Sequence, residues 1–192
     1  MSYLYLTDFL NLKEISSDLQ QELQTCIQVK EVKKGEIIIS KGDLKHKKFY
    51  VRNGLLRSYI IDSKGREHIY MFAPEGWVVS DLVSLTGNQP AIMFVDALED
   101  STLEVIDDER IWKLKDRFPE LMTSESDRML RRIAVLQQRV IMLLSASAQE
   151  RYEAFLTKYP DLIQRIPQKM IASYLGVTPE ALSKIRANMS KS

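Results

Sequence analysis

The sequence contains little of the chemistry that builds disulfides, metal centres or catalytic sites. Its single cysteine, Cys26, cannot form an internal disulfide or supply the thiolate set of an iron–sulfur cluster. We interpret Cys26 as a small, partly buried apolar residue near a helix end. The two histidines, His46 and His68, are too few and too scattered for the ligand set of a metal-dependent enzyme. Because no nucleophile–base pair can be assembled either, we do not expect an enzyme.

Long apolar runs and a strong net charge are also missing. The longest apolar stretch, residues 140–144, is far shorter than the roughly 18 residues that a membrane-spanning helix needs. The first residues carry no basic flank before an apolar run, so we expect no signal peptide. The sequence therefore predicts a soluble, cytoplasmic protein without a membrane partner. Because the formal net charge is only +1, a nucleic-acid surface requires basic residues gathered locally.

The sequence does contain enough apolar material for a core, with 45% hydrophobic and 28% charged residues. Residues 3–23 are expected to be helical, because Leu12, Ile15, Leu19 and Leu23 share one helical stripe. From residue 27 to 107 the pattern changes to short runs rich in β-branched and aromatic residues, separated by turn signals. The clearest runs are 36–39, 49–51, 55–61, 68–72 and 92–95. This spacing predicts a sandwich or barrel, and the Asn-Gly pair at 53–54 predicts a hairpin.

Helical patterns follow, with a short helix expected over about 109–121 and a longer one over about 125–145. The longer helix carries Met129, Ile133, Leu136, Val140 and Leu143 at heptad spacing, which is typical of two packed helices. One interpretation is a symmetric dimer interface, since two-fold pairing is the commonest oligomer. The alternative is a helix that packs on its own barrel, and the spacing alone does not separate the two.

The most specific pattern lies at residues 168–186. Ala172 supplies the small residue needed where two helices cross, and Gly176 supplies the positive φ of a tight turn. The second helix has a complete start, with Thr178 to cap it, Pro179 at its first position and Glu180 near its positive end. These features predict a helix-turn-helix, although an arbitrary helical hairpin can share the glycine and the apolar spacing.

The candidate DNA contacts lie around this second helix, whose outer face is free to meet a major groove. Basic residues modestly outnumber acidic ones between residues 149 and 192, which fits attraction to phosphate. The predicted DNA-binding residues are Lys169, Thr178, Glu180, Ser183, Lys184 and Arg186.

The order of these parts resembles the Crp/Fnr (cyclic-AMP receptor protein-like) family over essentially the whole chain. The likeness rests on residues 72–77 (FAPEGW), 96–100 (DALED) and 171–186 (IASYLGVTPEALSKIR). It implies an α+β fold with an N-terminal double-stranded β-helix (jelly-roll) barrel, a long dimerisation helix and a C-terminal helix-turn-helix. The implied division is 1–122 for the sensory barrel with its flanking helices, 123–148 for the dimerisation helix and hinge, and 149–192 for the DNA-binding domain, without a long C-terminal wing.

The resemblance also implies an effector pocket, with departures. In the family a Gly-Glu pair holds the ribose of a cyclic nucleotide, and an Arg-Ser or Arg-Thr pair grips its phosphate. Here Ser80-Asp81 and Pro90-Ala91 stand at those places, and a proline offers neither a cation nor an N–H, so we do not expect cyclic AMP in the usual manner. Asp81 either helps to hold another anion, with a backbone nest at 80–82, or only caps the segment 82–85. The candidate effector pocket comprises Gly76, Ser80, Asp81, Leu82, Pro90, Ala91 and Gln137.

Two further departures concern the recognition helix and the other sensory branches. The best-known members begin this helix with Arg-Glu and place another Arg four residues after the Glu, where this chain has Pro179-Glu180 and Lys184. Glu180 can accept from a cytosine amino group and Lys184 can donate to guanine or phosphate, so the familiar operator is not expected. The haem- and oxygen-sensing branches need ligand sets that one cysteine and two scattered histidines do not supply.

Together these features predict a dimeric, sequence-specific DNA-binding transcription regulator with a two-fold symmetric operator. The expected partners are double-stranded DNA, a second copy of the chain, RNA polymerase and an unidentified small effector in the barrel; no cofactor is assigned. Two alternatives stay open. One is an orphan regulator that binds DNA constitutively with a collapsed pocket, and the other is a ligand-binding or interaction module without DNA affinity.

Overall fold

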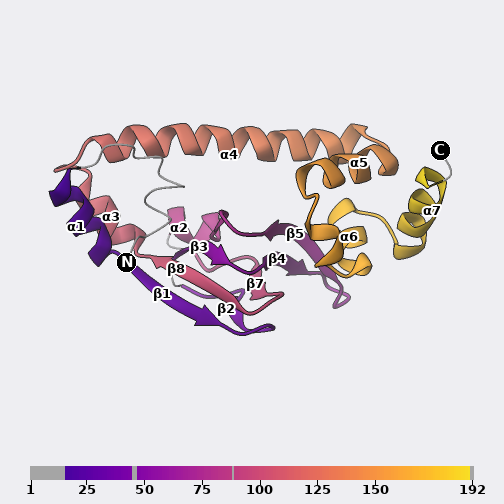
Figure 1. Cartoon of the computed structure of the whole chain (residues 1–192), viewed down its shortest axis with the longest axis horizontal. Helices are drawn as coiled ribbons and strands as arrows, with labels where there is room; N and C mark the ends of the chain where they lie inside the picture. Colours follow the sequence, from indigo (N-terminus) through magenta and orange to yellow (C-terminus); the bar gives the residue numbers. More distant parts are fainter. Residues whose placement is uncertain (1–15, 45–46, 88, 191–192) are drawn as a thin grey trace.

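Two four-stranded antiparallel sheets form the centre of the molecule (Figure 1). The structure is a computed structural model that describes residues 16–44, 47–87 and 89–190. In the first sheet, called sheet A, the strand order is β1 (Ile27–Val32), β8 (Ser101–Ile106), β3 (Lys48–Asn53), β6 (Val78–Val79). In sheet B the order is β2 (Ile37–Ile39), β7 (Phe94–Ala97), β4 (Leu56–Ile61), β5 (Glu67–Ala73). The sheets face each other as a jelly-roll barrel, which confirms the predicted fold class.

The helices around the barrel are α1 (Ser17–Thr25), α2 (Leu82–Gly87), α3 (Asp108–Leu114), α4 (Glu120–Ser145), α5 (Ala148–Lys158), α6 (Gln168–Leu175) and α7 (Pro179–Met189). At the start of α1 the Ser16 hydroxyl accepts from the Leu19 N–H at 3.2 Å. The rest of the helix expected over 3–23, with Leu12 and Ile15, lies outside the described residues. None of the helices in the described part of the chain is long and apolar enough to cross a membrane.

Three apolar clusters hold these layers together. Between the sheets, side chains such as Val51, Leu56 and Leu103 are fully buried. A second cluster, which includes Leu23 and Ile111, packs α1, α3 and the start of α4 on sheet A. The third cluster packs α5, α6 and α7 on sheet B. Each sheet therefore has one face on the barrel interior, and helices pack on part of its other face.

The prediction of a hairpin at Asn53-Gly54 is wrong. Strand β3 pairs with β8 and β6, whereas β4 pairs with β5 and β7, so this turn joins strands of different sheets. The glycine is still needed, because its φ is +99° and a Cβ there would overlap the Ser101 side chain. The Asn-Gly pair thus marks the point where the chain passes from sheet A to sheet B and the Gly54 backbone lies close to Ser101. Within the region assigned to strands, β1, β6 and β8 had no individual prediction.

The long helix α4 begins directly after Pro119, earlier than expected, and α3 is correspondingly shorter. It runs along one side of the barrel from α3 to α5 (Figure 1). A capping box then starts α5: the Ser147 hydroxyl accepts from the Glu150 N–H, and the Glu150 carboxylate accepts from the Ser147 N–H at 2.7 Å. The joint between the long helix and the C-terminal helices is therefore a short, well-capped turn.

Candidate nucleic-acid interface

The turn between α6 and α7 has the geometry predicted for a helix-turn-helix. Gly176 lies in the left-handed region at φ +71°, and its N–H donates to the Ala172 carbonyl at the end of α6. The Thr178 hydroxyl caps α7 by accepting from the Ala181 N–H at 3.2 Å, and Pro179 occupies the first helical position. Ala172 is fully buried where the helices meet. The helix-turn-helix prediction is confirmed.

One face of α7 is open to solvent. Glu180, Ser183 and Lys184 are exposed, whereas Leu182 on the opposite side is only 1% exposed. The Ser183 hydroxyl donates to the Pro179 carbonyl at 3.0 Å, within the helix. We call this exposed surface, formed by Glu180, Ser183 and Lys184, the recognition face.

The other predicted DNA-binding residues surround the recognition face. Lys169 is exposed near the start of α6, Thr178 is exposed at the start of α7, and Arg186 is half-buried in the last turn of α7. Hydrogen bonds from its own backbone N–H and from the Thr178 hydroxyl hold the pKa of Glu180 below its ordinary value. Glu180 is therefore ionised at neutral pH and offers a hydrogen-bond acceptor at the start of the helix.

The opposite side of the helix-turn-helix unit packs on the barrel. Leu55, Tyr59, Ile69 and Phe72 of sheet B and its border share one apolar cluster with the C-terminal helices. We call it the docking cluster. Its members from the C-terminal segment, each exposed by 4% or less, are Tyr152, Phe155, Tyr159, Leu162, Ile166, Ile171, Ala172, Leu175 and Leu182. The recognition helix is thus joined to the barrel by a continuous apolar core.

Aromatic rings form the centre of the docking cluster. The Phe72 ring of β5 lies 5.5 Å from Tyr174 of α6 and 6.3 Å from Phe155 of α5, between ring centroids. Tyr159 lies 5.3 Å from Phe155 and 5.6 Å from Trp77 of the barrel. Burial, and then the neighbouring Tyr174, raise the pKa of Tyr159 above its ordinary value. Each such aromatic pair adds about 0.5–1.5 kcal/mol beyond the burial of its area.

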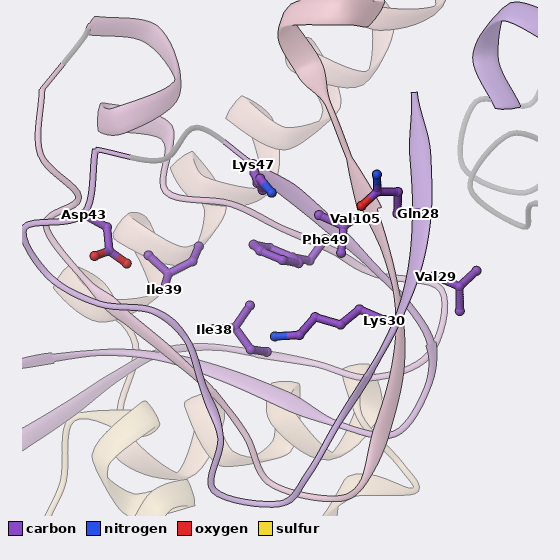
Figure 2. A pocket seen from close by; sticks show the side chains of 9 residues that line it. All are labelled: Gln28, Val29, Lys30, Ile38, Ile39, Asp43, Lys47, Phe49 and Val105. Carbon is purple, nitrogen blue, oxygen red and sulfur yellow. The ribbon is translucent and has the colours of Figure 1, made fainter. Parts of the chain in front are cut away.

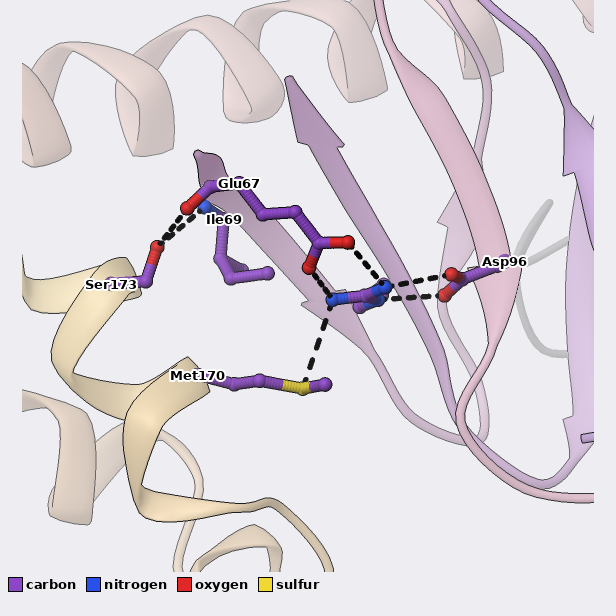
Figure 3. Close-up of polar contacts among 6 residues, drawn as sticks. Glu67, Ile69, Asp96, Met170 and Ser173 are labelled. Carbon is purple, nitrogen blue, oxygen red and sulfur yellow. Dashed lines mark hydrogen bonds and ion pairs between the residues drawn. The ribbon is translucent and has the colours of Figure 1, made fainter. Parts of the chain in front are cut away.

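A serine on α6 completes the edge of sheet B (Figure 3). Strand β5 is an edge strand, so its outward backbone groups need partners. The Ser173 hydroxyl accepts from the Ile69 N–H and donates to the Glu67 carbonyl, both at 3.0 Å. This side chain takes the place of a neighbouring strand and fixes α6 along β5.

A buried arginine of β4 bonds to Glu67 and Asp96, the two carboxylates labelled in Figure 3. Arg57 of β4 donates to both carboxylate oxygens of Asp96 at 2.8 and 2.9 Å and also to Glu67. Burial lowers the pKa of Arg57, but the hydrogen bonds to Asp96 and Glu67 raise it more, so the guanidinium stays charged. Its Nη1 atom lies 3.9 Å from the Met170 sulfur of α6. The docked helix α6 therefore contacts the buried guanidinium through Met170.

Two further arginines tie the helix-turn-helix unit to the rest of the chain. Arg165, after the short 3-10 helix Leu162–Gln164, donates to Glu75 at 3.0 Å and to Glu99 at 2.7 and 3.0 Å on two barrel turns. Arg139 of α4 donates to the Tyr174 carbonyl at 3.1 Å and lies 3.8 Å above the Tyr174 ring. The unit is therefore held by both the barrel and the long helix.

The residues predicted to form an effector pocket do not meet around a described cavity. Ser80, Asp81 and Ala91 are buried at 4, 1 and 2% exposure, and Leu82 is half-buried. Gly76, Pro90 and Gln137 are exposed. The Asp81 carboxylate accepts from the Ser84 N–H at 3.0 Å, so the capping role that we considered for this residue is confirmed.

A cavity of about 350 Å³ lies elsewhere, beside β1, β2 and β3 (Figure 2). Apolar side chains such as Ile38 and Phe49 line it together with Lys30 and Lys47. Lys30 is already paired with Glu36 at 2.8 Å. None of the predicted effector residues lines this cavity.

The heptad residues of α4 are largely open to solvent in the single chain. Ile133, Val140 and Leu143 are 52, 54 and 45% exposed, and Leu136 is half-buried. The side chain of Met129 lies outside the described part of the chain. Packing on its own barrel, the alternative that we considered for this helix, would cover these side chains and does not account for the exposure.

His68 and Cys26 make local contacts within the protein. His68 Nε2 lies 3.0 Å from the Asp62 carboxylate on the surface, and His46 lies outside the described residues. Cys26 is 4% exposed at the end of α1, and its thiol donates to the Glu22 carbonyl at 3.4 Å. Within residues 16–44, 47–87 and 89–190 no group of three His, Cys, Asp or Glu side chains is arranged to hold a metal ion.

Known proteins share this architecture. Residues 29–118 match the cyclic nucleotide-binding domain family. The chain is 29% identical to the fumarate and nitrate reduction regulatory protein of Vibrio cholerae, over 92% of this chain and 74% of that protein. The structure of FixK2 from Bradyrhizobium japonicum superimposes with a TM-score of 0.74 at 18% identity, covering 86% of this chain and 85% of that one. A CooA variant from Carboxydothermus hydrogenoformans gives a TM-score of 0.71 at 17% identity, covering 100% of this chain and 85% of that one.

A cyclic nucleotide-binding-type barrel followed by a long helix and a helix-turn-helix defines a class of sensory transcription regulators. The matched family, the relatives and the similar structures are all consistent with the barrel, the long helix and the helix-turn-helix described above. In sequence and in fold the chain is similar to the Crp/Fnr family of transcription regulators.

The Arg165 ion pairs predict a pH-dependent contribution to stability. Burial raises the pKa of Glu75, but hydrogen bonds from Arg165, its own N–H and the Gly54 N–H outweigh this, so the pKa lies below the ordinary value of 4.5. A carboxyl with a depressed folded pKa stabilises the protein above its unfolded pKa and loses that contribution as the pH falls through the folded pKa. Arg165→Met should therefore cost about 1 kcal/mol at pH 7, because the pairs are partly exposed, and less below pH about 4.

Urea unfolding of wild type and Arg165→Met between pH 3 and 7 checks this. Lys113→Met is the control, because its ion pair with Glu109 is 70 and 82% exposed and should contribute nothing measurable at any pH. A gap between wild type and Arg165→Met that stays constant over this pH range would contradict the role assigned to Glu75.

Proposed function

We propose that the chain is a dimeric, sequence-specific DNA-binding transcription regulator. The observation that carries this proposal is the orientation of the helix-turn-helix, whose inner side packs on the barrel while the recognition face is open. In Figure 1, α6 lies against β5 and α7 lies at the outer end of the molecule. A helix presented in this way, with its N-terminal residues free, is suited to enter a major groove.

The chemistry of the recognition face supports base reading. The ionised Glu180 can accept from a cytosine amino group, and Lys184, one turn later, can donate to guanine or phosphate. The Ser183 hydroxyl already donates within the helix but keeps its lone pairs for a donor on the DNA. We assign Lys169, Thr178 and Arg186 to contacts with the DNA backbone, which fix position without reading sequence.

The exposed seam of α4 supports dimerisation. A two-fold partner would cover Ile133, Val140 and Leu143 with the same residues of its own helix. Two recognition helices would then face half-sites about one helical turn apart, roughly 34 Å between their centres. The partners that we propose are accordingly a two-fold symmetric operator and a second copy of the chain. RNA polymerase as a partner and an effector in the barrel stay predictions.

Substitutions on the recognition face test the DNA contacts. A sequence selected from genomic fragments with the purified protein is the probe. Lys184→Ala and Glu180→Ala should each weaken binding to it about 5- to 150-fold, and Glu180→Ala should also relax the sequence preference. Lys113→Ala removes the same charge from α3 at the other end of the molecule and should leave binding unchanged. Mobility shifts at several salt concentrations measure this, and unaltered binding by both α7 variants would refute the assignment.

A charged residue in the seam tests the dimer. Ile133→Glu combined with Val140→Glu places two carboxylates where the partner's apolar side chains should lie, so the dimer should dissociate to monomers. DNA affinity should fall with it, because one helix-turn-helix contacts only one half-site. Ile37→Glu, at a 52% exposed position on the barrel, is the matched control. Light scattering reports the mass, and a monomeric wild type would overturn the proposal.

A further inference from the structure

A buried carboxylate stands at the centre of the segment that the family uses for its effector. Asp81 is 1% exposed, directly before α2. Its Oδ1 atom accepts from the Ser84 N–H at 3.0 Å, and its Oδ2 atom accepts from the N–H groups of Ile92 at 2.8 Å and Met93 at 3.2 Å. The three donors come from two segments of the chain that are otherwise joined by the loop between α2 and β7.

Such a carboxylate is costly to bury unless it is well hydrogen-bonded. In the described part of the chain, the partners of the Asp81 carboxylate are backbone N–H groups and it forms no ion pair with a basic side chain. Ile92 and Met93 precede the first residue of β7, so they bond to Asp81 instead of a neighbouring strand. Converging backbone N–H groups of this kind form an anion site. Its occupant here is the side chain of the protein itself.

The site joins the two places where the family resemblance implies contact with an effector, the ribose at Ser80-Asp81 and the phosphate at Pro90-Ala91. Ala91, 2% exposed, directly precedes the two donors, and Ser80, 4% exposed, precedes the carboxylate. We propose that Asp81 is an internal ligand, whose carboxylate fills the anion site of the barrel and holds Ile92 and Met93 beside the start of α2 without an external effector. The barrel then needs no anionic ligand to satisfy these N–H groups.

The role of Asp81 goes beyond the proposed function, and only its consequence for DNA binding rests on that function. If the chain binds DNA as proposed, it does so without any cyclic nucleotide or other anionic effector. The occupancy of the anion site does not depend on DNA binding. Failure of DNA binding would therefore refute the proposed function and leave the role of Asp81 to be decided by the experiment below.

Removal of the carboxylate should open the site to an external anion, with inorganic phosphate as the probe. Asp81→Ala should lower the melting temperature, and millimolar phosphate at constant ionic strength should restore about 3 °C or more of it. The wild type should not respond, because its site is filled. Asp107→Ala is the matched control: the Asp107 carboxylate also accepts from a backbone N–H at the start of a helix, that of Arg110 at 3.1 Å, but at α3 and outside this site. It should lose stability and gain no response to phosphate.

If Asp81→Ala fails to fold, two further measurements still test the proposal. Asp81→Asn keeps the size of the side chain but not its charge, so it should be destabilised and unresponsive to phosphate; wild-type stability would overturn the proposal. In the wild type, the amide NMR signals of Ile92 and Met93 should stay unchanged in millimolar phosphate or cyclic AMP. Saturable shifts of these signals, or a folded Asp81→Ala that ignores phosphate, would equally overturn it.

Discussion

The arrangement of this protein depends on the docking cluster, the apolar contact between the C-terminal helices and the outer face of sheet B. Phe72 and Ile69 project from β5 into the same core as Phe155 and Leu175 of the helix-turn-helix unit. This contact buries the inner sides of α5 and α6, and so it decides which side of α7 is left to solvent. The polar contacts of Ser173 and Arg165 fix the register of the docked unit; the apolar area supplies most of the driving force.

The docked unit and the exposed seam of α4 together constrain how the protein can meet DNA. The helix-turn-helix is joined both to the barrel and, through Arg139, to α4. In the proposed dimer, the position of each recognition face would therefore follow from how the two copies pair. In this account, pairing along α4 sets the separation of the two faces, and Asp81 removes the need for an effector to stabilise the barrel. Ligand control would require a second arrangement with different affinity for the ligand.

Local features were predictable from the sequence, whereas contacts between distant segments were not. The helix-turn-helix was predicted because Ala172, Gly176 and Thr178 act within a few residues of one another. The Asn-Gly pair at 53–54 led to a wrong hairpin prediction. A glycine with positive φ is found both in hairpin turns and, as here, in a turn that joins two different sheets. The Ser173 contact with β5 depends on residues more than a hundred positions away, and no local pattern encodes it. For Asp81 the cap was foreseeable, but the donors at Ile92 and Met93 were not.

Hydrogen exchange at the Ile69 amide tests the central claim most directly, because this N–H donates to Ser173 only while the helix-turn-helix is docked. If the docked arrangement is the one that binds DNA, the Ile69 amide is protected in the free protein and stays protected when the selected operator is added. Rapid exchange in the free protein, or protection that is lost on binding the operator, would contradict the account.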